Sequence, residues 1–161
     1  MRSPSWRLRQ LGMALPAVPT PAGAYLPAVR AGDLVFTAGQ LPLVDGALAV
    51  TGLVGSEVSI EEAAACARTA ALNAVAAAAD AAGGVDAVGR VVKVVVFVAS
   101  APGFTAQAQV ANGASDLLAE IFGPAGRHAR SAVGVAALPL RAPVEVELVA
   151  EIRAVPTIHA I

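Results

Sequence analysis

The sequence has few charged and few aromatic side chains. Charged residues make up 14% of its 161 positions and aromatic residues 4%, whereas charged residues usually account for about 25% of a soluble protein. Lys93 is the one lysine, the formal net charge is −1, and the basic residues form no cluster beyond Arg7 and Arg9. Nucleic-acid binding depends on basic stripes and stacking aromatic rings. The composition therefore argues against nucleic acid as the main partner.

Cysteine and histidine are also scarce. Cys66 is the single cysteine, and there are two histidines. One cysteine cannot form a disulfide within the chain, which is typical of a reducing compartment, and so few ligands argue against a closed zinc site. The sequence contains no P-loop, dinucleotide-binding glycine motif or Gly-x-Ser-x-Gly elbow. We expect a protein that needs no metal and no cofactor.

Long hydrophobic runs are missing as well. The most apolar run, from Val91 to Ala99, is shorter than the roughly 20 residues that cross a bilayer. The first residues carry arginines but not the long apolar stretch of a secretory signal. We therefore expect a cytoplasmic protein with no membrane partner.

Apolar residues are nevertheless abundant, at 57% of the chain. A chain of this length is typical of one domain, and its few charges leave little polar material to cover a monomer. Large exposed apolar patches usually mark interfaces. The composition therefore favours an oligomer.

Turn and cap signals predict the elements. Ser59 and Glu62 have the spacing of a capping box, and Gly83 with Gly84 supplies a stop. Asp45-Gly46 is a strong hairpin signal. A short helix after Ser3 is expected within an N-terminal extension over 1–20, before a domain over 21–155 and a tail over 156–161. The domain is predicted to contain strands near 25–30, 34–38, 47–54, 91–99, 130–137 and 144–152, and helices over 59–82 and 106–122.

The resulting order, β-β-β-α-β-α-β-β, predicts an α+β fold with two helices on one face of a mixed sheet. In the strand that begins at Arg130, alternate residues share a face. The arginine would lie there beside Ala132, Gly134 and Ala136, which leave a hollow next to a guanidinium suited to a carboxylate. The alternative is that Arg130 pairs with a carboxylate of its own protein.

The last strand alternates apolar and acidic residues. Val144, Val146 and Leu148 should face the helices, so that Glu145 and Glu147 point to the other face. Such glutamates usually form a solvated surface. At an interface, one of them would be placed to hold a water or to pair with Arg130.

Three segments resemble landmarks of the Rid/YjgF family of enamine/imine deaminases and their relatives. Arg130-Ser131-Ala132-Val133-Gly134-Val135-Ala136-Ala137-Leu138-Pro139, followed by Val144-Glu145-Val146-Glu147, is similar to the C-terminal signature. Gly32 to Pro42 and Val92 to Val98 resemble two earlier landmarks, in the same order.

This resemblance implies a chorismate-mutase-like fold and a homotrimer with clefts between subunits. It implies that Arg130 grips a substrate carboxylate and that Glu145 is linked to the hydrolytic water. Tyr25, Ala38 and Gly39 would contribute to the pocket. The expected activity is hydrolysis of 2-imino or 2-enamino acids to ketoacids and ammonia.

The sequence also departs from the family pattern. Ala132 stands where a cysteine is common, and the candidates for the family's pocket asparagine are Asn112 and, as an alternative, Ser115. These departures keep open a non-catalytic trimer that binds small carboxylates as a sensor or carrier. Ribonuclease activity, known for some relatives, is disfavoured by the near absence of lysine. Tyr25 is equally typical of a packed aromatic, and His128 is more typical of a surface histidine.

Overall fold

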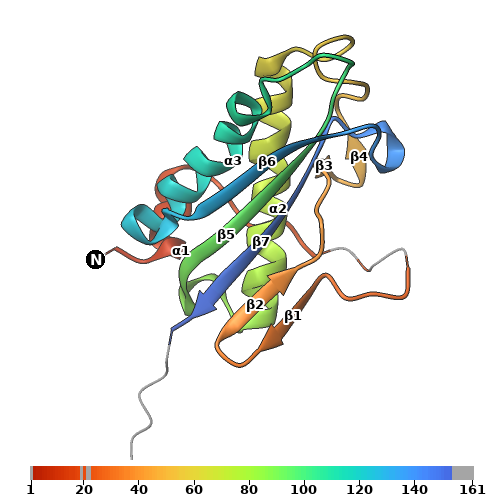
Figure 1. The fold of residues 1–161 in the computed structure, drawn as a ribbon. Coiled ribbons are helices and arrows are strands. Elements are labelled where there is room, and N and C mark those ends of the chain that lie inside the picture. The colour runs from red at the N-terminus through yellow and green to blue at the C-terminus, as the bar shows by residue number, and fades with distance from the viewer. Residues whose placement is uncertain (1, 19, 21–22, 154–161) are drawn as a thin grey trace, which may run out of the picture.

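The computed structural model describes residues 2–18, 20 and 23–153. One sheet has the strand order β1-β2-β7-β5-β6 (Figure 1). Strands β5 and β6 are parallel and the other neighbours are antiparallel. This is the mixed sheet that the sequence predicts. Its strands are β1 (Ala28–Ala31), β2 (Leu34–Thr37), β5 (Val88–Ala99), β6 (Ala129–Val135) and β7 (Val144–Ile152).

Helix α2 (Ile60–Ala82) begins and ends where its cap residues predict. The Ser59 hydroxyl accepts a hydrogen bond from the Glu62 amide at 3.2 Å, and the Glu62 carboxylate accepts one from the Ser59 amide at 2.9 Å. Gly83 ends the helix with φ 86°, a conformation that costs glycine little. The buried face of α2 is mostly alanine, so the helix lies close to the sheet.

Helix α3 (Gln107–Phe122) lies on the same side of the sheet, against β5 and β6 (Figure 1). Leu117, Leu118 and Ile121 are fully buried and supply most of its apolar contact. The backbones of α2 and α3 approach so closely that a Cβ atom at Gly113 would overlap the carbonyl of Ala64. A one-turn 3-10 helix, η2 (Gly123–Gly126), then leads into β6.

The strand predicted over 47–54 begins at Ala47 as expected but is only two residues long. A separate two-stranded hairpin forms instead, from β3 (Leu43–Val44) and β4 (Ala47–Leu48). The Asp45-Gly46 turn is confirmed, with φ 51° and 80°. Gly52 has φ 124° and gives its amide to the carbonyl of Arg141 at 2.9 Å, so the chain leaves the extended conformation before it reaches residue 54.

The expected N-terminal helix is present as α1 (Pro4–Gln10), capped by Ser3. It contacts α3 and the 3-10 helix η1 (Val85–Ala87), and Ser5 donates from its amide and hydroxyl to Asp86 at 2.9 and 2.7 Å. The predicted tail over 156–161 lies outside the described residues. No helix in the described ranges has the length and apolar character needed to cross a bilayer.

The sheet face opposite α2 and α3 is covered by no helix of the described chain (Figure 1). It carries Val29, Phe36 and Val133, whose exposed fractions are 48%, 40% and 41%. Glu145 and Glu147 lie on this open face, as the alternation predicts, because Val144, Val146 and Leu148 are buried on the other. We call this surface the open sheet face.

Candidate functional site

Arg130 lies on β6, which is an edge strand of the sheet. It pairs in register with Val94, which is buried beneath the helices. The Arg130 side chain therefore projects toward the helix side, into the angle between β6 and α3. It does not reach the open sheet face.

Three oxygen atoms of α3 hold the Arg130 guanidinium. Nη1 donates to Asn112 Oδ1 at 2.9 Å and to Ser115 Oγ at 3.0 Å. Nη2 donates to the carbonyl oxygen of Ala108 at 3.3 Å. Both residues considered as the pocket asparagine thus contact the arginine.

These bonds use three of the five guanidinium N–H groups. Among the described residues, one donor on Nε and one on Nη2 have no hydrogen-bond partner. All three acceptors are uncharged, and none of the ion pairs among the described residues involves Arg130. The alternative in which Arg130 pairs with an internal carboxylate is therefore not observed in the described chain.

Gly134, on the same face of β6 as Arg130, lies close to two polar side chains. A Cβ atom at Gly134 would lie 2.9 Å from Gln107 Nε2 and 3.0 Å from Ser100 Oγ. The glycine therefore lies close to Gln107, the first residue of α3, and to Ser100, which follows β5. Ala132 packs against the hydrophobic core, and Ala136 lies beyond the end of β6.

His128 is half-buried and bonded at both ring nitrogens, contrary to its interpretation as a surface histidine. Nδ1 lies 2.6 Å from the carbonyl oxygen of Gly126, and Nε2 lies 3.0 Å from Ser115 Oγ. The histidine is thereby joined to Arg130 through one serine. The only feature of the sequence that indicates this contact is the position of His128 two residues before Arg130, which places both on one face of a strand.

Gly39 and Glu145 meet on the open sheet face. A Cβ atom at position 39 would overlap Oε1 of the Glu145 carboxylate, so only glycine allows this approach. Burial raises the pKa of the Glu145 carboxyl above its ordinary value, and the negative charge of Glu147 raises that pKa further. Ala38 precedes this contact and donates its amide to Pro27 at 2.8 Å.

Tyr25 is far from both groups in sheet order. It precedes β1, which forms the edge of the sheet opposite to β6, and its exposed fraction is 54%. The predicted residues thus fall into three groups on one chain. Tyr25 lies at one edge, Gly39 and Glu145 lie on the open face, and Arg130 with Asn112 lies at the other edge.

Arg130 and Glu145 are separated by the sheet itself. Their strands lie on either side of β5, where Arg130 is opposite Val94 and Glu145 is opposite Phe97. Two strand spacings and three residues of rise place their Cα atoms about 14 Å apart, and their side chains project from opposite faces. One small molecule cannot touch both residues of the same chain.

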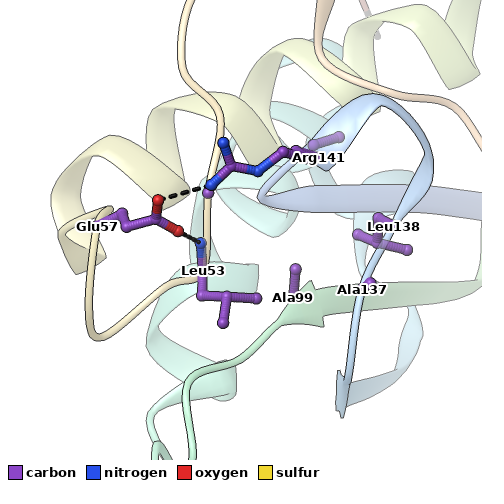
Figure 2. A pocket seen from close by; sticks show the side chains of 8 residues that line it. Leu53, Glu57, Ala99, Ala137, Leu138 and Arg141 are labelled. Carbon is purple, nitrogen blue, oxygen red and sulfur yellow. Dashed lines mark hydrogen bonds and ion pairs between the residues drawn. The ribbon is translucent and has the colours of Figure 1, made fainter.

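A cavity of about 200 Å³ lies elsewhere, at the end of β5. Figure 2 shows the Glu57 carboxylate between the Arg141 guanidinium and the Leu53 amide, at 2.6 and 2.9 Å. The lining is otherwise apolar. Because Arg141 and Glu57 already neutralise each other, the cavity presents no unpaired charge to a ligand.

Metal and thiol chemistry find little support in the described ranges. Within residues 2–18, 20 and 23–153, no three histidine, cysteine, aspartate or glutamate side chains gather closely enough to hold a metal ion. Cys66 is buried within α2. Burial raises the pKa of its thiol, as does the negative charge of Glu62, so the reactive thiolate is disfavoured.

Comparison with known proteins identifies the family. The family described as "YjgF/chorismate mutase-like, putative endoribonuclease" matches residues 5–152. This chain belongs to the YjgF family. The match confirms the sequence-based resemblance and includes both the Arg130 strand and the Gly39 segment.

Individual members of the YjgF family are similar over almost their whole length. Protein TCP17 of Trypanosoma cruzi is 47% identical over 146 residues, which are 90% of this chain and 91% of that protein. The structure of Atu1372 from Agrobacterium tumefaciens is 42% identical with a TM-score of 0.85, and 94% of each chain is covered. Escherichia coli TdcF with bound serine is 28% identical with a TM-score of 0.61, over 85% of this chain and 94% of that one.

Proposed function

We propose that this protein hydrolyses 2-imino or 2-enamino acids to ketoacids and ammonia, in a cleft between two copies of the chain. The observation that carries this proposal is the state of Arg130. Its guanidinium is fixed by three neutral acceptors, yet it retains donors on Nε and Nη2. A carboxylate is the partner that such a guanidinium edge binds best.

The second reacting group is Glu145, supplied by another copy. Its raised pKa, caused mainly by burial, suits a group that takes and returns a proton. Water adds to the C=N carbon while its proton passes to the carboxylate. That proton is then passed to nitrogen, which gives a carbinolamine. The carboxylate next moves the proton of the new hydroxyl group to nitrogen, the C–N bond breaks, and ammonia leaves as the C=O bond forms. The reaction consumes one water and needs no oxidant or reductant.

The open sheet face supports assembly from several copies. It presents exposed valine and phenylalanine side chains around Glu145, and such patches usually mark interfaces. In a closed ring, each copy would contribute Arg130 to one cleft and Glu145 to the next. We propose a homotrimer, as the family resemblance implies.

The serine bound to TdcF supports a ligand that carries a carboxylate. Serine is also compatible with the second candidate, a trimer that binds small carboxylates without turnover. One observation favours this alternative: Ala132 packs on the core and gives the site no polar group. The two candidates share the Arg130 contact and differ only at Glu145.

The decisive experiment supplies freshly generated 2-iminobutyrate or 2-iminopropionate to the purified protein and follows the ketoacid formed. We expect faster ketoacid formation than without protein, and the acceleration should be lost in both Arg130→Ala and Glu145→Gln. Equal rates for the wild type and buffer would reject the hydrolase. Retained pyruvate binding in that case, detected by calorimetry and lost in Arg130→Ala, would select the binding protein.

A further inference from the structure

A chain of hydrogen bonds continues from Arg130 into the protein. Nη1 of Arg130 contacts Ser115 Oγ at 3.0 Å, and Ser115 Oγ contacts His128 Nε2 at 3.0 Å. His128 Nδ1 contacts the carbonyl oxygen of Gly126 at 2.6 Å. We propose that His128 is a positioning residue that acts through Ser115 to hold the Arg130 guanidinium in its ligand-binding orientation.

The direction of each bond follows from the groups involved. A carbonyl oxygen only accepts, so the proton of a neutral imidazole must lie on Nδ1. Nε2 then has a lone pair and accepts from the Ser115 hydroxyl. The serine's one hydrogen is thereby directed at His128, while its oxygen accepts from Arg130, which can only donate. All three contacts are satisfied by a single arrangement of protons.

This arrangement has a consequence for the guanidinium. A free serine hydroxyl rotates and offers its oxygen in changing directions, whereas His128 fixes the hydrogen of Ser115 and so fixes the lone pair that faces Nη1. Hydrogen bonds in such a chain also polarise and strengthen one another. Asn112 and Ala108 also bind this guanidinium and would keep it in the site without Ser115. The hydrogen bonds through Ser115 and His128 therefore set the orientation of the guanidinium.

The carbonyl group of Gly126, which accepts from His128, is held in a fixed position. Gly126 is buried in η2, where a Cβ atom would overlap the carbonyl of Leu118 in α3. The carbonyl that receives the His128 proton is therefore fixed to the same helix that carries Ser115. His128 closes a link between the end of α3 and the strand of Arg130.

This inference rests on the proposed function only for its effect on ligand binding, so part of the test needs no ligand. Nitrogen-15 NMR at alkaline pH reports the tautomer of the His128 imidazole, and His128→Phe assigns the signal. We expect a proton on Nδ1 and slow rotation about the Arg130 Cζ–Nη1 bond. A proton on Nε2, or equally slow rotation in His128→Phe, would overturn the proposal.

The second part measures pyruvate binding by calorimetry in a matched set of variants. His128→Phe and Ser115→Ala should each weaken binding about tenfold, the scale of one hydrogen bond to a charged group. His128→Gln should recover part of the affinity, because its amide oxygen can accept from Ser115. Thr69→Ala, which removes a hydroxyl from α2, is the control and should bind normally.

The outcomes separate this inference from the proposed function. If the wild type fails to bind pyruvate, the proposed ligand class is rejected. The tautomer of His128 and the rotation rate of the Arg130 guanidinium still test the positioning role of His128. If pyruvate binding requires Arg130 but is unchanged in His128→Phe and Ser115→Ala, the positioning role is rejected and the carboxylate site stands. Should His128→Phe fail to fold, His128→Gln and the wild-type tautomer decide the question.

Discussion

Arg130 and Glu145 project from opposite faces of the sheet, on two strands that flank β5. The two side chains therefore do not share a cleft within one chain. The site as proposed therefore depends on the relation between copies, and this dependence can be tested by mixing variants.

We expect Arg130→Ala and Glu145→Gln to complement each other. Each variant alone should lack imine hydrolysis, whereas a mixed trimer brings an intact arginine of one copy to an intact glutamate of the next. Random assembly of equal amounts restores about a quarter of the clefts. The measurement is the hydrolysis rate after joint refolding, compared with the two variants refolded apart. Absence of any gain would show that the residues do not meet across an interface.

Gly39→Ala should reduce turnover without unfolding the protein. The added Cβ overlaps the Glu145 carboxylate, whose flexible side chain can move away, so the proton-transfer group is displaced. We expect a loss of about tenfold to a hundredfold in kcat, as for misplacement of an acid–base group. The control is Gly39→Ala in the Glu145→Gln background, where no further loss should occur. An additional loss there would assign Gly39 a separate role.

The raised pKa of Glu145 predicts a pH-dependent stability. A carboxyl whose pKa is raised by folding binds its proton more tightly in the folded state, so the free energy of unfolding falls as pH rises above the ordinary value of 4.5. Glu145→Gln should therefore raise Tm at neutral pH, with a gain that shrinks as the pH falls toward that value and is absent below it. Scanning calorimetry across this range provides the measurement. Glu151→Gln, on the same strand but exposed, is the control, and an equal gain there would contradict the explanation.

The capping box of α2 predicts a measurable loss of stability. Ser59→Ala removes the hydroxyl that accepts from the Glu62 amide, and the loss of such a cap costs about 1 kcal/mol. Urea unfolding of Ser59→Ala beside Ser56→Ala tests this, since Ser56 is exposed three residues earlier. The control should stay within about 0.5 kcal/mol of the wild type. Equal losses would show that the cap contributes nothing specific.

Local signals predicted the helices well because the deciding residues are adjacent in sequence. Ser59, Glu62 and Gly83 fix both ends of α2 through bonds within four residues. The Asp45-Gly46 turn is predicted equally well, because its two residues are adjacent in sequence. The length of the third strand is not predicted: β4 ends at Leu48, and Gly52 beyond it bonds to Arg141, which is remote in sequence.

The surroundings of Arg130 were harder to predict for the same reason. Alternation correctly predicts that Ala132 and Gly134 lie on the same face as the arginine, but it cannot show that Gln107 lies beside Gly134. That contact depends on how α3 packs against β6. The bonds to Ser115 and His128 likewise arise only once the helix and the strand are joined.

The tight contact between α2 and α3 also affects the site around Arg130. Gly113, which permits that contact, lies between Asn112 and Ser115, the two α3 side chains that bond to Arg130. A methyl group added at position 113 would overlap the backbone of α2 at Ala64. Helix α3 would then have to move away from α2, and Asn112 and Ser115 would move with it. The orientation of the Arg130 guanidinium thus depends on the distance between α2 and α3, because that distance sets the position of its two α3 acceptors.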